Sequence, residues 1–226
     1  FCIQYSVCGI KTLNCYTILM KRLLIATHNP AKVTEIKLGL KPLTKSGIKL
    51  ITISDLKIKD KPEETGKTFE ENALLKAKFY ADISKLPTLA DDGGVAIKEL
   101  NGEPGVKSRM WLGYEATDEE LINHTLKELK GKGMDKRKAY LETCLCYFDR
   151  KTNTTIYQKE RINGYIAIKP SSKRLEGYPF RSLFIINVSG KSKYYDGLNS
   201  KEQRQLNHRL IAINRILPKI QKHLLK

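Results

Sequence analysis

Short apolar runs alternate with segments of helical spacing along most of the chain. The run at residues 22–26 predicts a buried strand, and a second strand is predicted over residues 48–54. Between them, Asn29 can cap a helix that has a proline in its first turn. The apolar face of that helix is formed by Val33, Ile36 and Leu40.

Three later helices are predicted from capping boxes. In such a box one polar side chain caps the helix, and a Glu or Gln three positions further on completes the pair. Pro218 falls inside the last of these helices and predicts a kink there. The boxes are Thr68 with Glu71, Thr117 with Glu120, and Ser200 with Gln203.

The remaining apolar runs predict strands. The run before Asp91 predicts a strand that ends in a turn at Gly93–Gly94. Alternation over residues 138–162 predicts a β-hairpin that turns near Thr152–Asn153. Strands and helices thus follow one another in a mixed α/β order without an internal repeat. A further strand pair is predicted near residues 164–168 and 182–188.

Composition narrows the class of protein. The chain has 226 residues, of which 41% are hydrophobic and 29% charged, and this is typical of a globular protein. No apolar run approaches the roughly 20 residues that span a bilayer, so no membrane partner is expected. We expect one domain over residues 20–226. Residues 1–19 form an N-terminal extension that is predicted to be disordered or not native.

The charge and the cysteines indicate partners and compartment. A formal net charge of +17 attracts polyanions such as nucleic acid or phosphorylated small molecules, although scattered lysines on a solvated surface are an equal alternative. Three of the five cysteines lie in the first fifteen residues. Cys144 and Cys146 point to the same face of a predicted strand, which is poor geometry for a mutual disulfide. A reduced, cytoplasmic protein is predicted.

Acidic side chains stand at the ends of two predicted elements. Asp91 and Asp92 come directly after an apolar run, and two neighbouring negative charges need a positive partner. Mg²⁺ takes one or two carboxylates and leaves its other positions to water and phosphate oxygens. Glu64 lies just ahead of the helix that begins at Thr68. A carboxylate there can also be no more than a partner of the helix dipole.

Basic and polar side chains stand at two predicted helix starts. The turn Thr27–Lys32 joins a strand to a helix, and the free N–H groups of a helix N-terminus bind phosphate readily. The alternative is an ordinary Asn cap with a solvated lysine. His208 and Arg209 can donate hydrogen bonds to a base carbonyl or to a phosphate, although a lone histidine on a helix is often structural.

Five motifs in order resemble those of the inosine triphosphate pyrophosphatases, enzymes that remove non-standard purine nucleoside triphosphates. The resemblance extends over residues 21–217 and implies an elongated α/β fold with a long mixed central sheet, two lobes and an intervening cleft. It also implies Mg²⁺-dependent hydrolysis of ITP, dITP or XTP to the monophosphate and pyrophosphate, by a homodimer. The motifs are ATHNPAK, EETGKTFEENALLKAK, LADDGG, EPGVKSR and NHR.

The resemblance implies a role for each matching residue. The triphosphate would be held by Thr27, His28, Asn29 and Lys32, with Lys76 reaching it from the second helix. Glu64 and Asp92 would hold Mg²⁺, and Asp92 would also act as general base on the attacking water. Asp91 would be a further carboxylate, in the second shell or on a second metal. Tyr178 would stack on the purine, which His208 and Arg209 would read through its 6-carbonyl.

The sequence departs from the family motifs where the base is recognised. The aspartate expected after Tyr178 is missing, and Gly93 stands where the family has a serine. Gln203 replaces a lysine, for which Arg204 is a candidate substitute, and Asn207 replaces a serine. A relaxed or shifted base preference is therefore predicted as a hypothesis.

Two other readings stay open from the sequence. A Maf-like nucleotide pyrophosphatase would share the fold, but its opening motif, Ser-x-Ser-Pro-Arg-Arg, differs from ATHNPAK. A basic nucleic-acid-binding protein with a decayed site would bind DNA or RNA with a steep salt dependence and show no turnover. No specific nucleic-acid partner is expected, because the sequence has no matching aromatic motif or zinc spacing.

Overall fold

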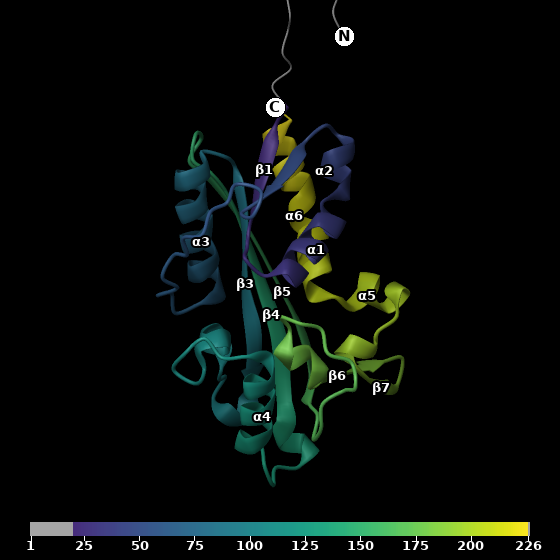
Figure 1. The fold of residues 1–226 in the computed structure, drawn as a ribbon. Helices are drawn as coiled ribbons and strands as arrows, with labels where there is room; N and C mark the ends of the chain where they lie inside the picture. Colours follow the sequence, from purple (N-terminus) through teal and green to yellow (C-terminus); the bar gives the residue numbers. More distant parts are fainter. Residues whose placement is uncertain (1–19, 226) are drawn as a thin grey trace, which may run out of the picture.

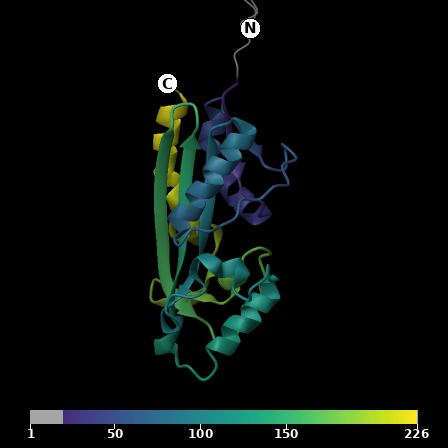
Figure 2. The same ribbon diagram turned by 90° about the vertical axis from the view of Figure 1, so that its left-hand side faces the viewer.

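One mixed sheet of seven strands runs through the computed structural model, which describes residues 20–225. Its strands are β1 (Arg22–Ala26), β2 (Lys49–Thr52), β3 (Thr88–Ile97), β4 (Lys138–Asp149), β5 (Thr154–Ile166), β6 (Phe184–Val188) and β7 (Lys191–Tyr194). The order across the sheet is β2-β1-β3-β4-β5-β6-β7. β1 is parallel to both β2 and β3, and every later pair is antiparallel. The long β4–β5 hairpin runs most of the length of the molecule (Figure 2).

Helices cover both faces of this sheet (Figure 1). They are α1 (Pro30–Gly39), α2 (Lys41–Lys45), α3 (Phe69–Ser84), α4 (Asp118–Glu128), α5 (Ser200–Leu206) and α6 (His208–Leu224). α1 and α6 pack on one face of β1, through Leu23 and Ile25, and α3 packs on the other, through Leu24 and Ala26. Alternate residues of a strand point to opposite faces, so one short apolar strand supplies both cores.

A third core lies at the other end of the sheet, where α4 packs near β6. It includes Leu121 and Ile122 of α4, Leu141 of β4 and Phe184 of β6. The predicted elongated fold, with a long mixed sheet and two lobes, is therefore confirmed. Among the described residues, no helix is both long enough and apolar enough to cross a membrane.

The prediction that Gly93–Gly94 ends a strand is wrong. β3 continues through both glycines to Ile97 and pairs with β4, with Gly93 opposite Thr143. A Cβ on Gly93 would lie 3.0 Å from the Thr143 Cα and still closer to the Glu142 carbonyl. A Cβ on Gly94 would lie 2.8 Å from the Gly105 carbonyl. Glycine is needed here because the neighbouring backbone lies too close for a side chain. A pair of glycines is also typical of a turn, so the sequence pattern does not distinguish the two cases.

The prediction of a single C-terminal helix that begins at Ser200 is also wrong. Two helices replace the one predicted, and α5 is capped by Asn199 with Glu202 rather than by Ser200 with Gln203. Asn207 caps α6, because its side-chain oxygen accepts hydrogen bonds from the backbone N–H groups of Arg209 and Leu210. The helix continues past Pro218 to Leu224.

Most other local predictions are confirmed. Asn29 caps α1, Thr68 caps α3, and Thr117 with Glu120 forms a complete capping box on α4. The predicted strand at residues 164–168 is the end of β5, and it pairs with β6 as expected. Cys144 and Cys146 are buried free thiols on the same face of β4. The predicted extension, residues 1–19, lies outside the described residues.

Candidate active site

A cleft of about 770 Å³ opens beside the middle of β3, between the two cores that cover β1 and the third core at the other end of the sheet. Its walls come from the turn before α1, the loop before α3, the centre of β3, the 175–181 segment and the first residues of α6. Twelve of the thirteen predicted site residues line it: Thr27, His28, Asn29, Lys32, Glu64, Lys76, Asp91, Asp92, Gly93, Tyr178, His208 and Arg209. Arg204 is the exception, because it is exposed on α5 and does not line the cleft.

The turn before α1 forms one wall through local capping. Asn29 Oδ1 accepts from the backbone N–H groups of Ala31 and Lys32 at 2.9 and 3.2 Å. The Asn29 amide also donates to the Gly177 carbonyl at 3.0 Å, so one side chain ties the helix start to the 175–181 segment. His28 Nε2 lies 3.0 Å from the Tyr80 hydroxyl of α3. The turn is therefore fixed from two sides.

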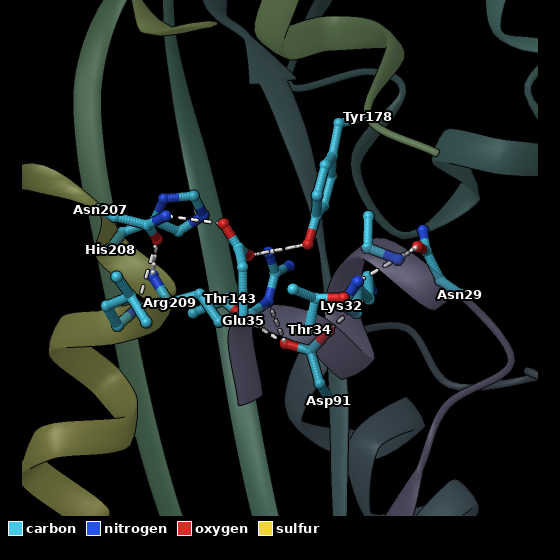
Figure 3. Close-up of polar contacts among 12 residues, drawn as sticks. Asn29, Lys32, Thr34, Glu35, Asp91, Thr143, Tyr178, Asn207, His208 and Arg209 are labelled. Atoms are coloured by element: carbon cyan, nitrogen blue, oxygen red, sulfur yellow. Dashed lines mark hydrogen bonds and ion pairs between the residues drawn. The ribbon is translucent and has the colours of Figure 1, made fainter. Parts of the chain in front are cut away.

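Asp91 and Asp92 are adjacent but face opposite sides of β3. Asp91 points to the α1 and α6 side, where Lys32 Nζ lies 2.7 Å from its Oδ2 and Arg209 Nε lies 3.1 Å from its Oδ1. The Thr143 hydroxyl donates to the same carboxylate (Figure 3). Burial alone would raise the pKa of Asp91, but Arg209 and Lys32 outweigh it and hold the pKa well below its usual range.

Asp92 points to the α3 side, where Lys76 joins it to Glu64. Lys76 Nζ lies 2.6 Å from Asp92 Oδ1 and 3.2 Å from Glu64 Oε2. Burial raises the pKa of Asp92, as expected for a carboxylate in a site of low polarity. Asp92 and Glu64 raise the pKa of Lys76 although its own burial opposes this, so the lysine remains an ammonium.

The carboxylates on this side suit a hard cation that is shared with phosphate. Asp92 Oδ2 is buried and has no hydrogen-bond partner within residues 20–225. Glu64 is 44% exposed at the mouth of the cleft, so its second oxygen is accessible. The described residues contain no group of three or more His, Cys, Asp or Glu side chains arranged for a metal. Two carboxylates fit Mg²⁺, which commonly relies on one or two and on substrate phosphates.

Three residues at the far end of the cleft, Tyr178, Arg181 and Arg209, are joined by Glu35, which does not itself line the cleft and was not among the predicted site residues. Its carboxylate accepts from Arg181 at 2.7 and 3.0 Å and from Arg209 at 2.9 Å. It also accepts from the Tyr178 hydroxyl and the Asn207 amide, both at 2.7 Å (Figure 3). Burial opposes ionisation, but Arg181 and Arg209 hold the pKa of Glu35 well below its usual range.

His208 begins α6 and is 4% exposed. Its Nδ1 lies 2.9 Å from the Tyr195 hydroxyl, which also accepts from the His208 backbone N–H at 3.3 Å. Burial and the neighbouring Arg209 lower the pKa of His208 well below its usual range, so its imidazole is neutral near pH 7. A neutral imidazole has one donor and one acceptor nitrogen, and Tyr195 takes up one of them.

Only one of the missed residues carried a sequence signal. Glu35 stands three positions after Lys32, and this spacing places both side chains on one face of α1. Arg181 stands three residues after Tyr178, on which it stacks, but its charged partner Glu35 comes from a distant segment, so its pairing has no local signal. Thr143 reaches Asp91 only through strand pairing in the sheet.

This combination of a capped helix start, paired carboxylates and an aromatic–arginine pocket defines a nucleotide-handling protein of the mixed α/β class. The chain belongs to the Ham1 family, whose profile matches residues 23–219. A dITP/XTP pyrophosphatase of Thermoanaerobacter sp. (strain X514) is 36% identical over 203 residues, which cover 90% of this chain and 98% of that protein. A dITP/XTP pyrophosphatase of Bacillus subtilis (strain 168) is 35% identical over 199 residues, covering 88% and 96%.

Solved structures agree with the sequence relatives. A HAM1 protein from Coxiella burnetii matches with a TM-score of 0.76 at 29% identity, and the match covers 90% of this chain and 100% of that protein. The Staphylococcus aureus Ham1 protein gives 0.74 at 29% identity, with coverage of 90% and 100%. The resemblance to the inosine triphosphate pyrophosphatases and the expected fold are both confirmed.

Proposed function

We propose that this protein is a nucleoside triphosphate pyrophosphatase that hydrolyses ITP, dITP or XTP to the monophosphate and pyrophosphate, and so cleanses the purine nucleotide pool. Relatives named dITP/XTP pyrophosphatases support the reaction class. The observation that carries the proposal is the pair Glu64 and Asp92 around Lys76, with one buried Asp92 oxygen left unpartnered. The family match favours this reading over the Maf-like alternative.

A triphosphate carries up to four negative charges and repels a hydroxide nucleophile, so the site has to supply positive charge where the phosphates bind. Lys32 and Lys76 both line the cleft, and the N-terminus of α1, whose first N–H groups are capped by Asn29, adds the positive end of its helix dipole. Together these groups orient the α–β anhydride bond toward β3. Asp91 keeps Lys32 and Arg209 in place and is itself enclosed by them.

Asp92 is the candidate general base. Its carboxylate is buried and its pKa is raised by that burial, so it is more basic than a surface aspartate. Taking a proton from the attacking water is a step typically worth about 10²–10⁴-fold in rate. Lys76 stays protonated beside it and stabilises the carboxylate between turnovers.

Mg²⁺, which Glu64 and Asp92 would hold, supplies charge neutralisation on the phosphates and a lower pKa for a bound water. Asp91 is proposed as a supporting carboxylate rather than a ligand, because Lys32, Arg209 and Thr143 already occupy its oxygens.

Base selection is proposed to depend on donors at the far end of the cleft. Hypoxanthine and xanthine carry a carbonyl at position 6, where adenine carries an amino group. His208 and Arg209 would donate to that carbonyl, whereas an adenine amino group would leave buried donors unpaired. Tyr178 would stack on the purine ring. Arg204, on the exposed face of α5, is not part of this proposal.

The homodimer and the cytoplasmic location stay predictions. Size-exclusion chromatography with light scattering tests the first, and localisation of a tagged full-length chain tests the second. The nucleic-acid alternative is tested by titrating DNA and RNA at two salt concentrations, because a decayed enzyme would bind with a steep salt dependence and no turnover.

One experiment tests the reaction. Purified protein is incubated with Mg²⁺ and ITP, dITP, XTP, GTP or ATP, and pyrophosphate is measured separately from orthophosphate. We expect pyrophosphate from ITP, dITP and XTP, and a loss of at least about 100-fold in the Asp92→Asn variant. Glu63→Gln is the matched control, because Glu63 is exposed and does not line the cleft. Wild-type turnover by Asp92→Asn would show that Asp92 is not the base.

The same panel tests the hypothesis of a relaxed base preference. Comparable turnover of ITP and GTP would support it, since both carry the 6-carbonyl and differ in the 2-amino group. A strong preference for ITP over GTP would contradict it.

A further inference from the structure

The guanidinium of Arg181 is stacked between two tyrosine rings. Its central carbon lies 3.6 Å from the ring centroid of Tyr178 and 5.3 Å from that of Tyr195. The Arg181 side chain is only 5% exposed. A guanidinium is planar and weakly hydrated, so it can lie flat against an aromatic face at little desolvation cost. Arg181 therefore covers one face of the Tyr178 ring.

Glu35 fixes both members of this stack. Arg181 donates two hydrogen bonds to the Glu35 carboxylate, at 2.7 and 3.0 Å, and the Tyr178 hydroxyl donates a third at 2.7 Å. A bidentate arginine–carboxylate pair fixes orientation as well as distance. The Tyr178 ring is thus held at one face by Arg181 and at its hydroxyl end by Glu35.

The position of this stack links it to substrate. Tyr178 and Arg181 both line the cleft, in the same short segment from which the family's aspartate is missing. A side chain that is already ordered loses less conformational entropy when a ligand binds to it. A ring that was free to rotate would lose that freedom each time a purine stacked on it.

We propose that Arg181 is a positioning residue for base recognition, which holds Tyr178 as a rigid stacking surface at the wall of the cleft where the purine binds. This inference rests on the proposed function and deepens it. Arg181 acts through Tyr178 and not through the phosphates. Its loss weakens binding of the base in the ground state and in the transition state alike, and this raises KM while kcat changes little.

A double-mutant cycle tests this dependence. Arg181→Ala, Tyr178→Ala and the double variant are compared with wild type, using ITP and a ribose 5-triphosphate that lacks a base. We expect Arg181→Ala to raise the KM for ITP up to about tenfold, the cost of ordering one freed side chain on binding. The KM for the base-free triphosphate is expected to stay unchanged. In the Tyr178→Ala background, removing Arg181 is expected to add no further rise.

Arg174→Ala is the matched control, because Arg174 is an arginine of the neighbouring loop whose ion pair with Glu119 is largely exposed. It is expected to leave KM for ITP at the wild-type value. Arg181→Lys keeps a positive charge near Glu35 but has no planar fork, so it should behave like Arg181→Ala. It also serves as the test if the alanine variant does not fold.

Three results would overturn the inference. They are an equal KM rise for ITP and the base-free triphosphate, a full further rise in the Tyr178→Ala background, and a wild-type KM in Arg181→Lys. Failure of the proposed function is distinguishable from all three, because wild-type protein would then release no pyrophosphate from any nucleotide. In that case the dissociation constant of inosine monophosphate is measured for the same four proteins and compared in place of KM.

Discussion

Asp91 and Asp92 are consecutive residues of β3 whose carboxylates lie in different electrostatic environments. Asp91 contacts Lys32 and Arg209 on the α1 and α6 side, whereas Asp92 contacts Lys76 on the α3 side. The alternation of a strand separates the two charges and gives each its own cation. The pKa of Asp91 is lowered, and that of Asp92 is raised by burial. One aspartate is therefore structural in character and the other is suited to proton transfer.

The first prediction is that neutralising these two neighbours lowers stability by unequal amounts. Asp91→Asn leaves Lys32 and Arg209 buried without their counter-charge, and breaking such a buried pair costs about 3–5 kcal/mol. Asp92→Asn also breaks a buried pair, with Lys76, but it removes a charge that burial disfavours and Lys76 keeps its contact with Glu64, so the loss in the free energy of unfolding should be smaller. Urea denaturation of both variants measures this. The control is Asp82→Asn, whose ion pair with Arg150 is exposed. Equal losses in the two variants would contradict the assignment.

The second prediction concerns Glu64 and the metal. Glu64→Gln removes one of the two carboxylates offered to Mg²⁺ but keeps the size of the side chain. We expect the Mg²⁺ concentration for half-maximal turnover to rise at least about tenfold. Isothermal titration of Mg²⁺ into protein with a non-hydrolysable nucleotide provides a readout besides activity. Glu63→Gln should titrate as wild type does, and an unchanged curve for Glu64→Gln would remove Glu64 from the site.

The third prediction is that restoring the family's serine at position 93 destabilises this protein. A Cβ on Gly93 would lie 3.0 Å from the Thr143 Cα and closer still to the Glu142 carbonyl, and both are backbone atoms of the paired strand. Overpacking of this kind typically costs about 1–3 kcal/mol. Thermal denaturation of Gly93→Ser measures it against Gly197→Ser, where the nearest atom is 3.9 Å away. A melting temperature equal to that of wild type would show that β4 moves aside freely.

The fourth prediction is a pH dependence that arises from Asp196. Burial raises the pKa of Asp196 to about 6, and its Oδ2 has no hydrogen-bond partner among residues 20–225. Between the unfolded pKa of about 3.9 and this value the folded state binds more protons, so the contribution of Asp196 to stability falls as pH rises. Above pH 6 the penalty of burying the charge is complete.

Asp196→Asn should therefore stabilise the protein more at pH 7.5 than at pH 4.5. Melting temperatures at the two pH values, with the exposed Asp135→Asn as control, test this. A gain that is the same at both pH values would exclude Asp196 as the source.

Local sequence chemistry was sufficient for much of the fold. Asn29, Thr68 and Thr117 cap helices where predicted, because a cap depends on a side chain and the backbone two or three residues away. It was insufficient at Gly93–Gly94, because glycine satisfies both a turn and a crowded strand, and only the distance to β4 distinguishes the two. It also failed at Ser200, where Asn199 is one residue earlier and equally able to cap.

The sequence by itself identified much of the chemistry of the cleft, since twelve of the predicted residues line it and the motifs that contain most of them are local. Only the tertiary structure decided how those charges are paired. Glu35, Arg181 and Asn207 meet because α1, the segment after Tyr178 and the start of α6 converge at one point of the sheet. Charge pairing at a distance of about 3 Å depends on that convergence, because Coulomb energy and hydrogen-bond geometry act in space and not along the chain.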